Sequence, residues 1–376
     1  MTKTLFVFTQ KDLVKLVLLL LFAVIFFGLT GLFMMLFMKW MTWQSYAQDA
    51  VDKHGISSVG ASRLGGVAVL LFTLGLLAVG YFNGFVRGPD GGFFEGNRWF
   101  WWIAVICCGL LGLVEDLRND YLSPRFRLCS ELTIFSVVVG ALPYLIPIHL
   151  GVPGLDALMS LPILGWLITT VFCVGFVNSI NMADGANGLV PGMMTVAFSI
   201  MFLETDAYVY GCLMTSCGLF TVFNIISGRL FLGDAGAYAL GAILALSGLH
   251  LFSEDIFSAG YLACLFAYPC IDFISTLIRR LRMGRSIFSP DNDHLHNRIH
   301  YHLRQWFSSK TLANSMTGTL VVALSSGLAI VGYFGQWWSV TSELWAWLFL
   351  FQCFAYGTVF YLTGVGRSTV QYVVPN

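Results

Sequence analysis

A series of long apolar segments separated by short polar loops constrains this chain more than any other feature. A bilayer core is crossed by about 17 to 25 mostly apolar residues, and eleven segments approach or exceed that length. They cover 14–38, 65–84, 99–114, 129–148, 159–177, 188–204, 207–226, 235–252, 256–278, 311–333 and 343–364. We therefore expect an all-α polytopic membrane protein. Because the third and sixth segments are short, we expect a bundle of about 10–11 transmembrane helices.

Composition supports this fold class. The chain is 57% hydrophobic and 11% charged, whereas soluble domains carry about 25% charged residues. A formal net charge of zero gives no reason to expect a nucleic-acid partner. The nine cysteines lie mostly in apolar runs without a C-x-x-C pair, which indicates buried thiols. We find no internal repeat and expect one domain over 1–376, with a first segment too long for a cleaved signal peptide.

Basic residues predict the orientation. The loops on one face hold most of the arginines, including those of 279–304, and the positive-inside rule makes this face cytoplasmic. With eleven spans, the C-terminus is then inside and the N-terminus outside. Lys3, Lys11 and Lys15 argue the other way for the first segment, but the later loops outnumber them.

Acids and amides gather on the same face. Glu115 and Asp116 end the third segment, and Asp234 opens the eighth between two glycines. Such acids are either solvated helix ends and N-caps or members of a site. In the run Asn178-Ser-Ile-Asn181-Met-Ala-Asp184-Gly, the two amides share a helical face and a carboxylate follows at the helix end. This pattern favours a hard-cation or ligand site over plain capping.

Basic and imidazole groups complete the cytoplasmic set. The arginines of 279–285, Arg285 included, could bind lipid head groups or the phosphates of a ligand. His294 and His296 follow in the same loop, where imidazoles donating to phosphate oxygens fit better than zinc. Lys53 precedes a glycine-rich stretch that suggests an anion contact, although positive-inside anchoring also explains it. Acids that hold magnesium, cations that hold diphosphate and an apolar bundle together suggest metal-assisted phosphoryl transfer between a nucleotide and a membrane lipid.

These clusters, in this order over about residues 53–300, resemble the polyprenyl-phosphate N-acetylhexosamine-1-phosphate transferase family. The run Ser289-Pro-Asp-Asn-Asp-His-Leu-His296 favours its undecaprenyl-phosphate N-acetylglucosamine-1-phosphate transferase branch over the phospho-N-acetylmuramoyl-pentapeptide translocases. The resemblance implies transfer of a sugar phosphate from a UDP-N-acetylhexosamine to undecaprenyl or another polyprenyl phosphate, with UMP released. It further implies magnesium, with manganese as an alternative, a bacterial inner membrane and a role in priming O-antigen or another cell-surface glycan.

The resemblance also assigns roles to residues. Glu115 and Asp116 fall on the family's paired-aspartate motif, with Asp116 as the candidate base, and Asp184 joins them as catalytic. Asp234 and Asn181 are the expected metal ligands. The expected substrate-binding residues are Lys53, Asn178, Asn187, Phe231, Arg285, His294 and His296, with Phe231 stacking on uracil.

The chain departs from the family's pattern at several positions. Glu115 stands in place of the first paired aspartate, Asn187 in place of an aspartate, Ala237 in place of a serine and Asn297 in place of a third histidine. These changes leave the sugar and nucleotide selectivity open. The sequence also leaves open the hexosamine, the pathway, a homodimer, a one- or two-step mechanism and the roles of His300 and His302.

Other functions fit part of the pattern. A nucleotide-sugar or lipid-linked sugar transporter would use helix breaks and intramembrane acids, but its polar groups should approach the midplane. Asp291-Asn292-Asp293 resembles the D-x-D motif of soluble glycosyltransferases, yet the βαβ pattern they need is missing. Asp184-Gly185 begins like the motif of CDP-alcohol phosphatidyltransferases without its later acids, and an inactive scaffold is a further alternative.

Overall fold

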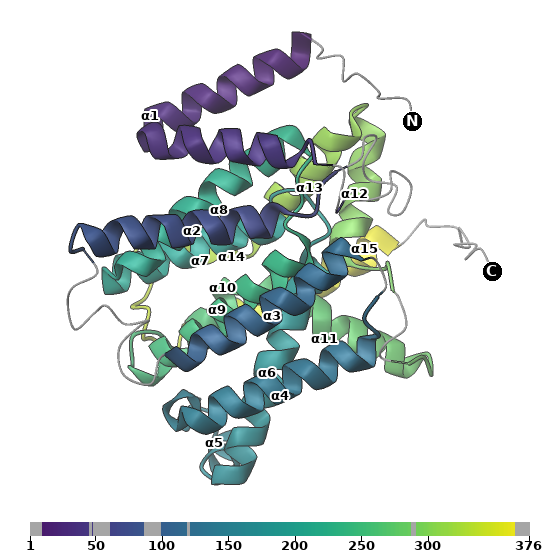
Figure 1. Cartoon of the computed structure of the whole chain (residues 1–376). Coiled ribbons are helices and arrows are strands. Elements are labelled where there is room, and N and C mark those ends of the chain that lie inside the picture. Colours follow the sequence, from purple (N-terminus) through teal and green to yellow (C-terminus); the bar gives the residue numbers. More distant parts are fainter. Residues whose placement is uncertain are drawn as a thin grey trace.

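The computed structural model describes residues 10–44, 47, 61–85, 99–118, 121–286 and 291–364, and these form a bundle of helices (Figure 1). In chain order they are α1 (Gln10–Met41), α2 (Gly65–Phe82), α3 (Trp99–Leu117), α4 (Pro124–Ala141), η2 (Pro143–Leu145), α5 (Pro153–Met159), α6 (Pro162–Ala183), α7 (Leu189–Thr205), α8 (Tyr208–Ser227), α9 (Gly233–Ser253), α10 (Ala259–Leu265), α11 (Ala267–Arg282), α12 (Leu295–Trp306), α13 (Lys310–Leu324), α14 (Ser326–Phe334) and α15 (Trp345–Gly364).

Each predicted apolar segment lies on one of these helices or on a bent pair. By length and hydropathy, the described residues contain seven helices able to cross a membrane, or nine if each bent pair counts as one span. The other two predicted segments correspond to α4 and α7. Helix α7 has 17 residues, and α4 carries Arg125, Arg127 and Glu131 within its 18 residues. The all-helical membrane fold is therefore confirmed, while α4 and α7 fall short of a typical span.

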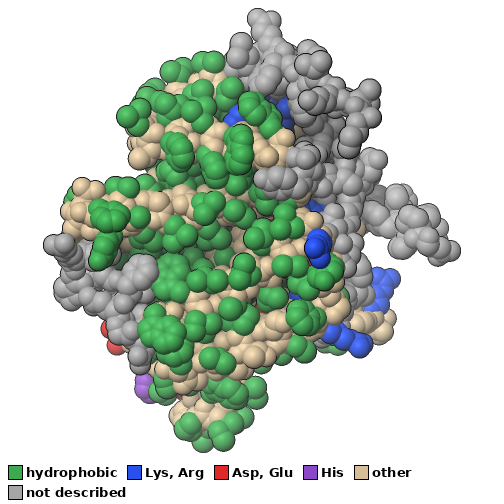
Figure 2. Space-filling view, in the orientation of Figure 1, with side chains coloured by type: hydrophobic (Ala, Val, Ile, Leu, Met, Phe, Trp, Pro, Cys, Tyr) green, Lys and Arg blue, Asp and Glu red, His purple; other side chains and the backbone are tan. Residues whose placement is uncertain are grey.

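Hydrophobic side chains cover most of the described surface on the face in Figure 2, and most of the visible basic side chains lie toward its right-hand end. Exposed residues such as Ile163 (76%) and Phe354 (73%) would be costly in water. In lipid they face hydrocarbon, so this surface suits a bilayer.

Helix α9 forms the centre of the bundle, and 94% of its most apolar 18-residue stretch is buried. It contacts α2, α3 and α6. Its sequence GDAGAYALGAILALSGLHLFS is rich in glycine and alanine, and small residues allow helix backbones to approach closely where lipid offers no hydrophobic driving force. Since α9 is held on several sides, its first residues have a fixed position.

Two predicted spans are broken. Helices α10 and α11 meet at 82° around Phe266, because Pro269 has no N–H and its ring clashes with the carbonyl four residues earlier. That carbonyl, of Leu265, instead accepts a hydrogen bond from Ser326 Oγ at 2.8 Å. Helices α13 and α14 bend by 48° at Ser325, whose carbonyl accepts a 3.0 Å hydrogen bond from Gln352 Nε2 of α15.

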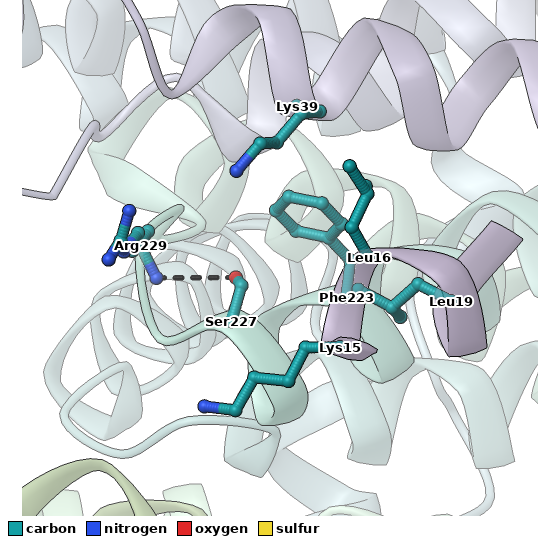
Figure 3. Close-up of a pocket in the computed structure, with 7 residues that line it drawn as sticks. All are labelled: Lys15, Leu16, Leu19, Lys39, Phe223, Ser227 and Arg229. Atoms are coloured by element: carbon teal, nitrogen blue, oxygen red, sulfur yellow. Dashed lines mark hydrogen bonds between the residues drawn. The ribbon is translucent and has the colours of Figure 1, made fainter. Parts of the chain in front are cut away.

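Helix α1 is also not straight. Gly28 has φ 60° and ψ −147°, a non-helical conformation inside the continuous apolar run. In Figure 1 the two halves of α1 fold back from this residue, so that both lead toward the same end of the bundle. Lys15 of the first half and Lys39 of the second accordingly line one pocket (Figure 3).

Candidate active site

The carboxylates of Asp116 and Asp184 hold the first turn of α9. Asp116, at the end of α3, accepts hydrogen bonds from the backbone N–H groups of Asp234 (3.0 Å) and Ala235 (2.8 Å). Asp184, which follows α6, accepts one from the backbone N–H of Gly233. The first N–H groups of a helix lack partners within it and carry partial positive charge, so acids are stabilised there. Three loops far apart in the sequence thus meet at one helix N-terminus.

Gly233 makes this meeting sterically possible. Its φ is 74°, in the left-handed region, and a Cβ there would lie 2.1 Å from the Arg63 carbonyl oxygen and 2.8 Å from Asp116 Oδ2. A side chain would therefore separate α9 from both neighbours. The preceding segment is held as well, because the backbone of Phe231 exchanges hydrogen bonds with Ser62 and Gly65.

Asp234 is partly accessible, with 27% of its side chain exposed. Its Oδ1 accepts a hydrogen bond from Asn181 Nδ2 at 2.8 Å, so the two predicted metal ligands are adjacent. Its Oδ2 lies 3.7 Å from Nη1 of Arg127, a residue of α4 that also contacts Tyr238. Burial and the nearby negative charge of Asp234 raise the pKa of Asp184 to about 7, against the opposing hydrogen bond from Gly233.

Asn178 faces a buried acid that sequence reasoning missed. Its Nδ2 donates to Glu131 Oε2 and to the Val174 carbonyl. Glu131 is fully buried, and its Oε1 has no hydrogen-bond partner within the described structure. Since Glu131 lies inside the predicted span 129–148, an ionisable group at that depth was the signal that would have found it.

The histidine loop is held by a second buried acid, Asp272 of α11. Its Oδ2 lies 2.5 Å from His294 Nδ1, and its Oδ1 accepts hydrogen bonds from the Leu295 N–H (3.1 Å) and the Tyr356 hydroxyl (2.7 Å). Burial lowers the pKa of His294, but the hydrogen bond and negative charge of Asp272 outweigh it, so the pKa is raised. Sequence reasoning missed Asp272 too, although it lies inside the predicted span 256–278.

His296 joins this loop to the end of α6. Its Nδ1 lies 2.6 Å from the Tyr268 hydroxyl, and its ring stacks at 5.5 Å on that of His294. A Cβ on Gly185 would lie only 2.1 Å from His296 Nε2. Burial lowers the pKa of His296 to about 4, so the ring is neutral at neutral pH.

The other predicted residues occupy varied positions. Glu115 is buried and accepts a hydrogen bond from the Leu122 N–H at 3.2 Å. Asn187 is buried and donates to Ser315 at 3.3 Å, with its Oδ1 unpartnered in the described structure. Phe231 is half-buried just before α9, and Arg285 is exposed after α11. Lys53 lies outside the described residues.

The acids of the D-x-D-like stretch are paired with arginines. Asp291 lies 2.7 Å from Arg279 Nη2, and Asp293 lies 2.7 Å from Arg298 Nη2. These ion pairs hold the histidine loop against α11 and α12.

The described residues contain no β-strand, only an isolated bridge between Ser62 and Leu230. The described part of the fold therefore has no Rossmann-like domain.

Among the described residues, no group of three or more His, Cys, Asp or Glu side chains is arranged to hold a metal ion alone. Magnesium needs fewer, because it is usually bound by one or two carboxylates together with substrate phosphates and water. Asp234 and the Asn181 amide offer such oxygen donors, and Asp116, Asp184 and Asp234 concentrate negative charge beside them. The donor set therefore fits a hard divalent cation shared with a ligand.

The fold and site define a multi-helix membrane protein with an acid- and amide-rich site where its helices end. Residues 98–251, which include α3, α6 and the start of α9, match the model of glycosyl transferase family 4. The chain thus contains a glycosyl transferase family 4 domain within a multi-helix membrane fold.

Named relatives include two N-acetylglucosamine-phosphate transferases and a phospho-N-acetylmuramoyl-pentapeptide-transferase. The chain is 29% identical over 275 residues to the decaprenyl-phosphate N-acetylglucosaminephosphotransferase of Mycobacterium leprae, covering 63% of this chain and 66% of the relative. It is 28% identical to the undecaprenyl-phosphate alpha-N-acetylglucosaminyl 1-phosphate transferase of Thermotoga maritima (60% and 68%). It is 31% identical to the phospho-N-acetylmuramoyl-pentapeptide-transferase of Lacticaseibacillus paracasei (42% and 53%). The chain thus spans about two thirds or less of the length of these relatives.

Proposed function

We propose that the protein transfers N-acetylhexosamine-1-phosphate from a UDP-sugar to undecaprenyl or another polyprenyl phosphate and releases UMP. The observation that carries this proposal is the convergence of Asp116, Asp184 and the Asn181–Asp234 pair on the start of α9, inside the matched domain. The names of the relatives support a polyprenyl phosphate acceptor and an N-acetylglucosamine phosphate group.

The reaction needs no net proton transfer when the acceptor phosphate is a dianion. An oxygen of the lipid phosphate attacks the phosphorus that bears the sugar, and the bond from that phosphorus to the oxygen bridging to UMP breaks. The electron pair of that bond leaves with UMP. Catalysis then depends more on holding the attacking oxygen in line with the departing UMP oxygen than on removing a proton.

Electrostatics argue that the donor diphosphate needs cations here. Asp116 and Asp184 accept the N–H groups of Gly233, Asp234 and Ala235, so these are not available to phosphate oxygens. Mg²⁺, or Mn²⁺ in its place, would be held by Asp234 and Asn181 and would neutralise charge as UMP departs. Arg127 beside Asp234 and the cationic form of His294 supply further positive charge.

Asp116 is better suited to positioning than to proton removal. Both of its oxygens accept backbone hydrogen bonds, and these fix the residue that carries the proposed metal ligand. We therefore assign Asp116 to holding Asp234 in place, and Asn178, His296 and Phe231 to the walls of the donor site. Roles for Glu115, Asn187 and Lys53 in substrate binding rest on the family resemblance.

We further propose that the site faces the cytoplasm of a bacterial inner membrane and that the product primes a cell-surface glycan. The basic residues of 279–304 support this orientation. An N-terminus outside would require α1 to cross the membrane once. The fold-back at Gly28 instead supports both ends of α1 at the cytoplasmic face, where Lys15 also satisfies the positive-inside rule.

The test is UMP release by purified protein given undecaprenyl phosphate, Mg²⁺ and a panel of UDP-N-acetylhexosamines, with and without EDTA. Asp234→Asn should abolish release. Glu254→Gln neutralises an acid that lies at the far end of α9, about 30 Å from Asp234, and should not. The proposal would be contradicted if both variants lost UMP release equally, or if no donor gave UMP. Binding of a UDP-sugar without turnover would favour a transporter.

A further inference from the structure

The aromatic ring of Phe360, near the C-terminal end of α15, contacts two arginines. The guanidinium carbon of Arg298 on α12 lies 3.6 Å from the ring centroid, and that of Arg279 on α11 lies 5.3 Å from it. The electron-rich face of an aromatic ring attracts cations at such distances. These three residues form an arginine clamp that joins α15 to both α11 and α12.

Each arginine of the clamp holds one acid of the D-x-D-like stretch. Arg279 Nε and Nη2 donate to Asp291 Oδ2 at 3.2 and 2.7 Å. Arg298 Nε and Nη2 donate to the two carboxylate oxygens of Asp293, each at 2.7 Å. Because such two-point pairs of arginine and carboxylate have a defined geometry, the two acids fix the segment that leads directly to the histidines.

The guanidinium of Arg298 is committed to protein partners. Its third nitrogen, Nη1, donates to the Phe360 carbonyl oxygen at 2.6 Å, and only 13% of the side chain is exposed. Helix α15 approaches so closely that a Cβ on Gly364 would lie 2.5 Å from Nη1. An arginine four positions after His294 could have bound a phosphate, but these contacts indicate that it positions the loop instead.

The clamp is linked to His294 through both side chain and backbone. Asp293, which the Arg298 side chain holds, directly precedes His294 in the sequence. The backbone N–H of Arg298 also donates to the His294 carbonyl at 3.1 Å. A shift of Arg298 would therefore move the histidine rings, and a hydrogen bond to a phosphate oxygen weakens once its donor leaves the range of about 2.7–3.2 Å.

We propose that Phe360 and Arg298 are positioning residues for the donor diphosphate, acting through Asp293 on His294 and His296. The C-terminal helix then determines donor affinity, although it lies outside the residues 98–251 that match the family model. The inference rests on the proposed function, in which the histidines face the diphosphate.

The test compares Phe360→Leu with Phe360→Tyr in the assay of UMP release, because leucine removes the aromatic ring and tyrosine retains it. Histidines that contact the diphosphate before and during the reaction contribute to KM more than to kcat. Phe360→Leu should therefore raise the KM for the UDP-sugar about tenfold and lower kcat less than about threefold. Phe360→Tyr should restore the KM. The matched control is Phe354→Leu, which removes a 73% exposed ring from the same helix and should change neither constant.

A purely structural role would give a different result. Loss of folded protein lowers kcat and leaves KM unchanged, and that outcome in Phe360→Leu would overturn the proposal. An unchanged KM, or an equal rise of KM in Phe354→Leu, would overturn it as well. If Phe360→Leu does not fold, Arg298→Lys takes its place, since lysine keeps the charge but lacks the planar group that pairs with Asp293.

Hydrogen exchange tests the clamp without catalysis. The backbone amides of 291–298 should exchange faster in Phe360→Leu than in the wild type or in Phe354→Leu, and equal exchange rates would contradict the inference even in an active enzyme. A wild type that releases no UMP would refute the proposed function instead. Calorimetric titration with UDP then replaces the KM: weaker UDP binding in Phe360→Leu alone supports the clamp, and equal affinities overturn it.

Discussion

The Oδ2 atom of Asp272 lies 2.5 Å from Nδ1 of His294 and fixes both the orientation and the charge of that ring. Asp272 also accepts hydrogen bonds from the Leu295 N–H and the Tyr356 hydroxyl, so it holds the start of α12 as well. The Nδ1 atom thus carries the proton shared with Asp272, and Nε2 is the nitrogen left to face a ligand. Asp272 is a positioning residue in this arrangement.

We expect Asp272→Asn to lower kcat/KM for UMP release about 10- to 100-fold, because a charge-assisted hydrogen bond worth about 1.5–3 kcal/mol is lost. The pH dependence separates this role from a merely structural one. Asp272 raises the pKa of His294 above 6.5, so donor affinity should fall as the pH rises through that raised value. In Asp272→Asn the fall should occur at lower pH.

Tyr356→Phe is the matched control, since it removes a hydrogen bond to Asp272 and leaves the His294 contact. Its pH profile should stay near that of the wild type, and identical profiles for all three proteins would rule out the assigned role. The free energy of unfolding should depend on pH in the same direction as donor affinity. Because the folded-state pKa of His294 is raised, its contribution to stability is complete below 6.5 and is lost as the pH rises through the raised pKa.

Asp116→Asn should lower both activity and stability. An amide in place of the carboxylate directs an NH₂ group toward the N–H of Asp234 or Ala235, and a buried donor left without a partner costs about 1–3 kcal/mol. We expect the Tm to fall and UMP release to drop at least about tenfold. Asp156→Asn, which disturbs a 2.7 Å hydrogen bond from Leu150 in a different loop, should lower the Tm alone. Normal activity in Asp116→Asn would remove Asp116 from the site.

Gly185→Ala tests the contact between α6 and the histidine loop. The new Cβ would lie 2.1 Å from His296 Nε2, so the ring must move away from Tyr268 at a cost of about 1–3 kcal/mol. We expect the KM for the UDP-sugar to rise about tenfold. Gly175→Ala, within α6, is the control, since its Cβ would meet only Phe273 at 3.7 Å. An unchanged KM in Gly185→Ala would show that His296 does not shape the donor site.

The sequence predicts the helices well because their apolar runs are long and the bilayer leaves the backbone few alternatives. The family resemblance also names Asn181 and Asp234 together as metal ligands, and the folded chain places their side chains in hydrogen-bond contact. The sequence says less about which other side chains contact the motif residues. Asp272 and Glu131 are isolated acids in apolar runs, and only the folded bundle shows that they hold His294 and Asn178.

The breaks within spans differ in how visible they are. Pro269 marks the bend between α10 and α11, because a proline inside a helix removes a hydrogen bond and clashes with the preceding turn. Gly28 gives no such signal. Transmembrane helices contain many glycines, and whether a glycine adopts a left-handed conformation depends on what the two flanking segments pack against.

Gly28→Ala tests the fold-back of α1 and, with it, the position of the N-terminus. A Cβ at Gly28 meets nothing within 4 Å, so the substitution acts only through backbone strain at φ 60°, worth about 1–3 kcal/mol. Gly75→Ala is the matched control, because its Cβ also meets nothing within 4 Å but its backbone is helical. We expect Gly28→Ala to favour a straighter α1. The measurement is an N-terminal green fluorescent protein, which fluoresces when it stays in the cytoplasm. Wild type and Gly75→Ala should fluoresce fully and Gly28→Ala less, whereas a dark wild-type fusion would place the N-terminus outside and require α1 to cross the membrane.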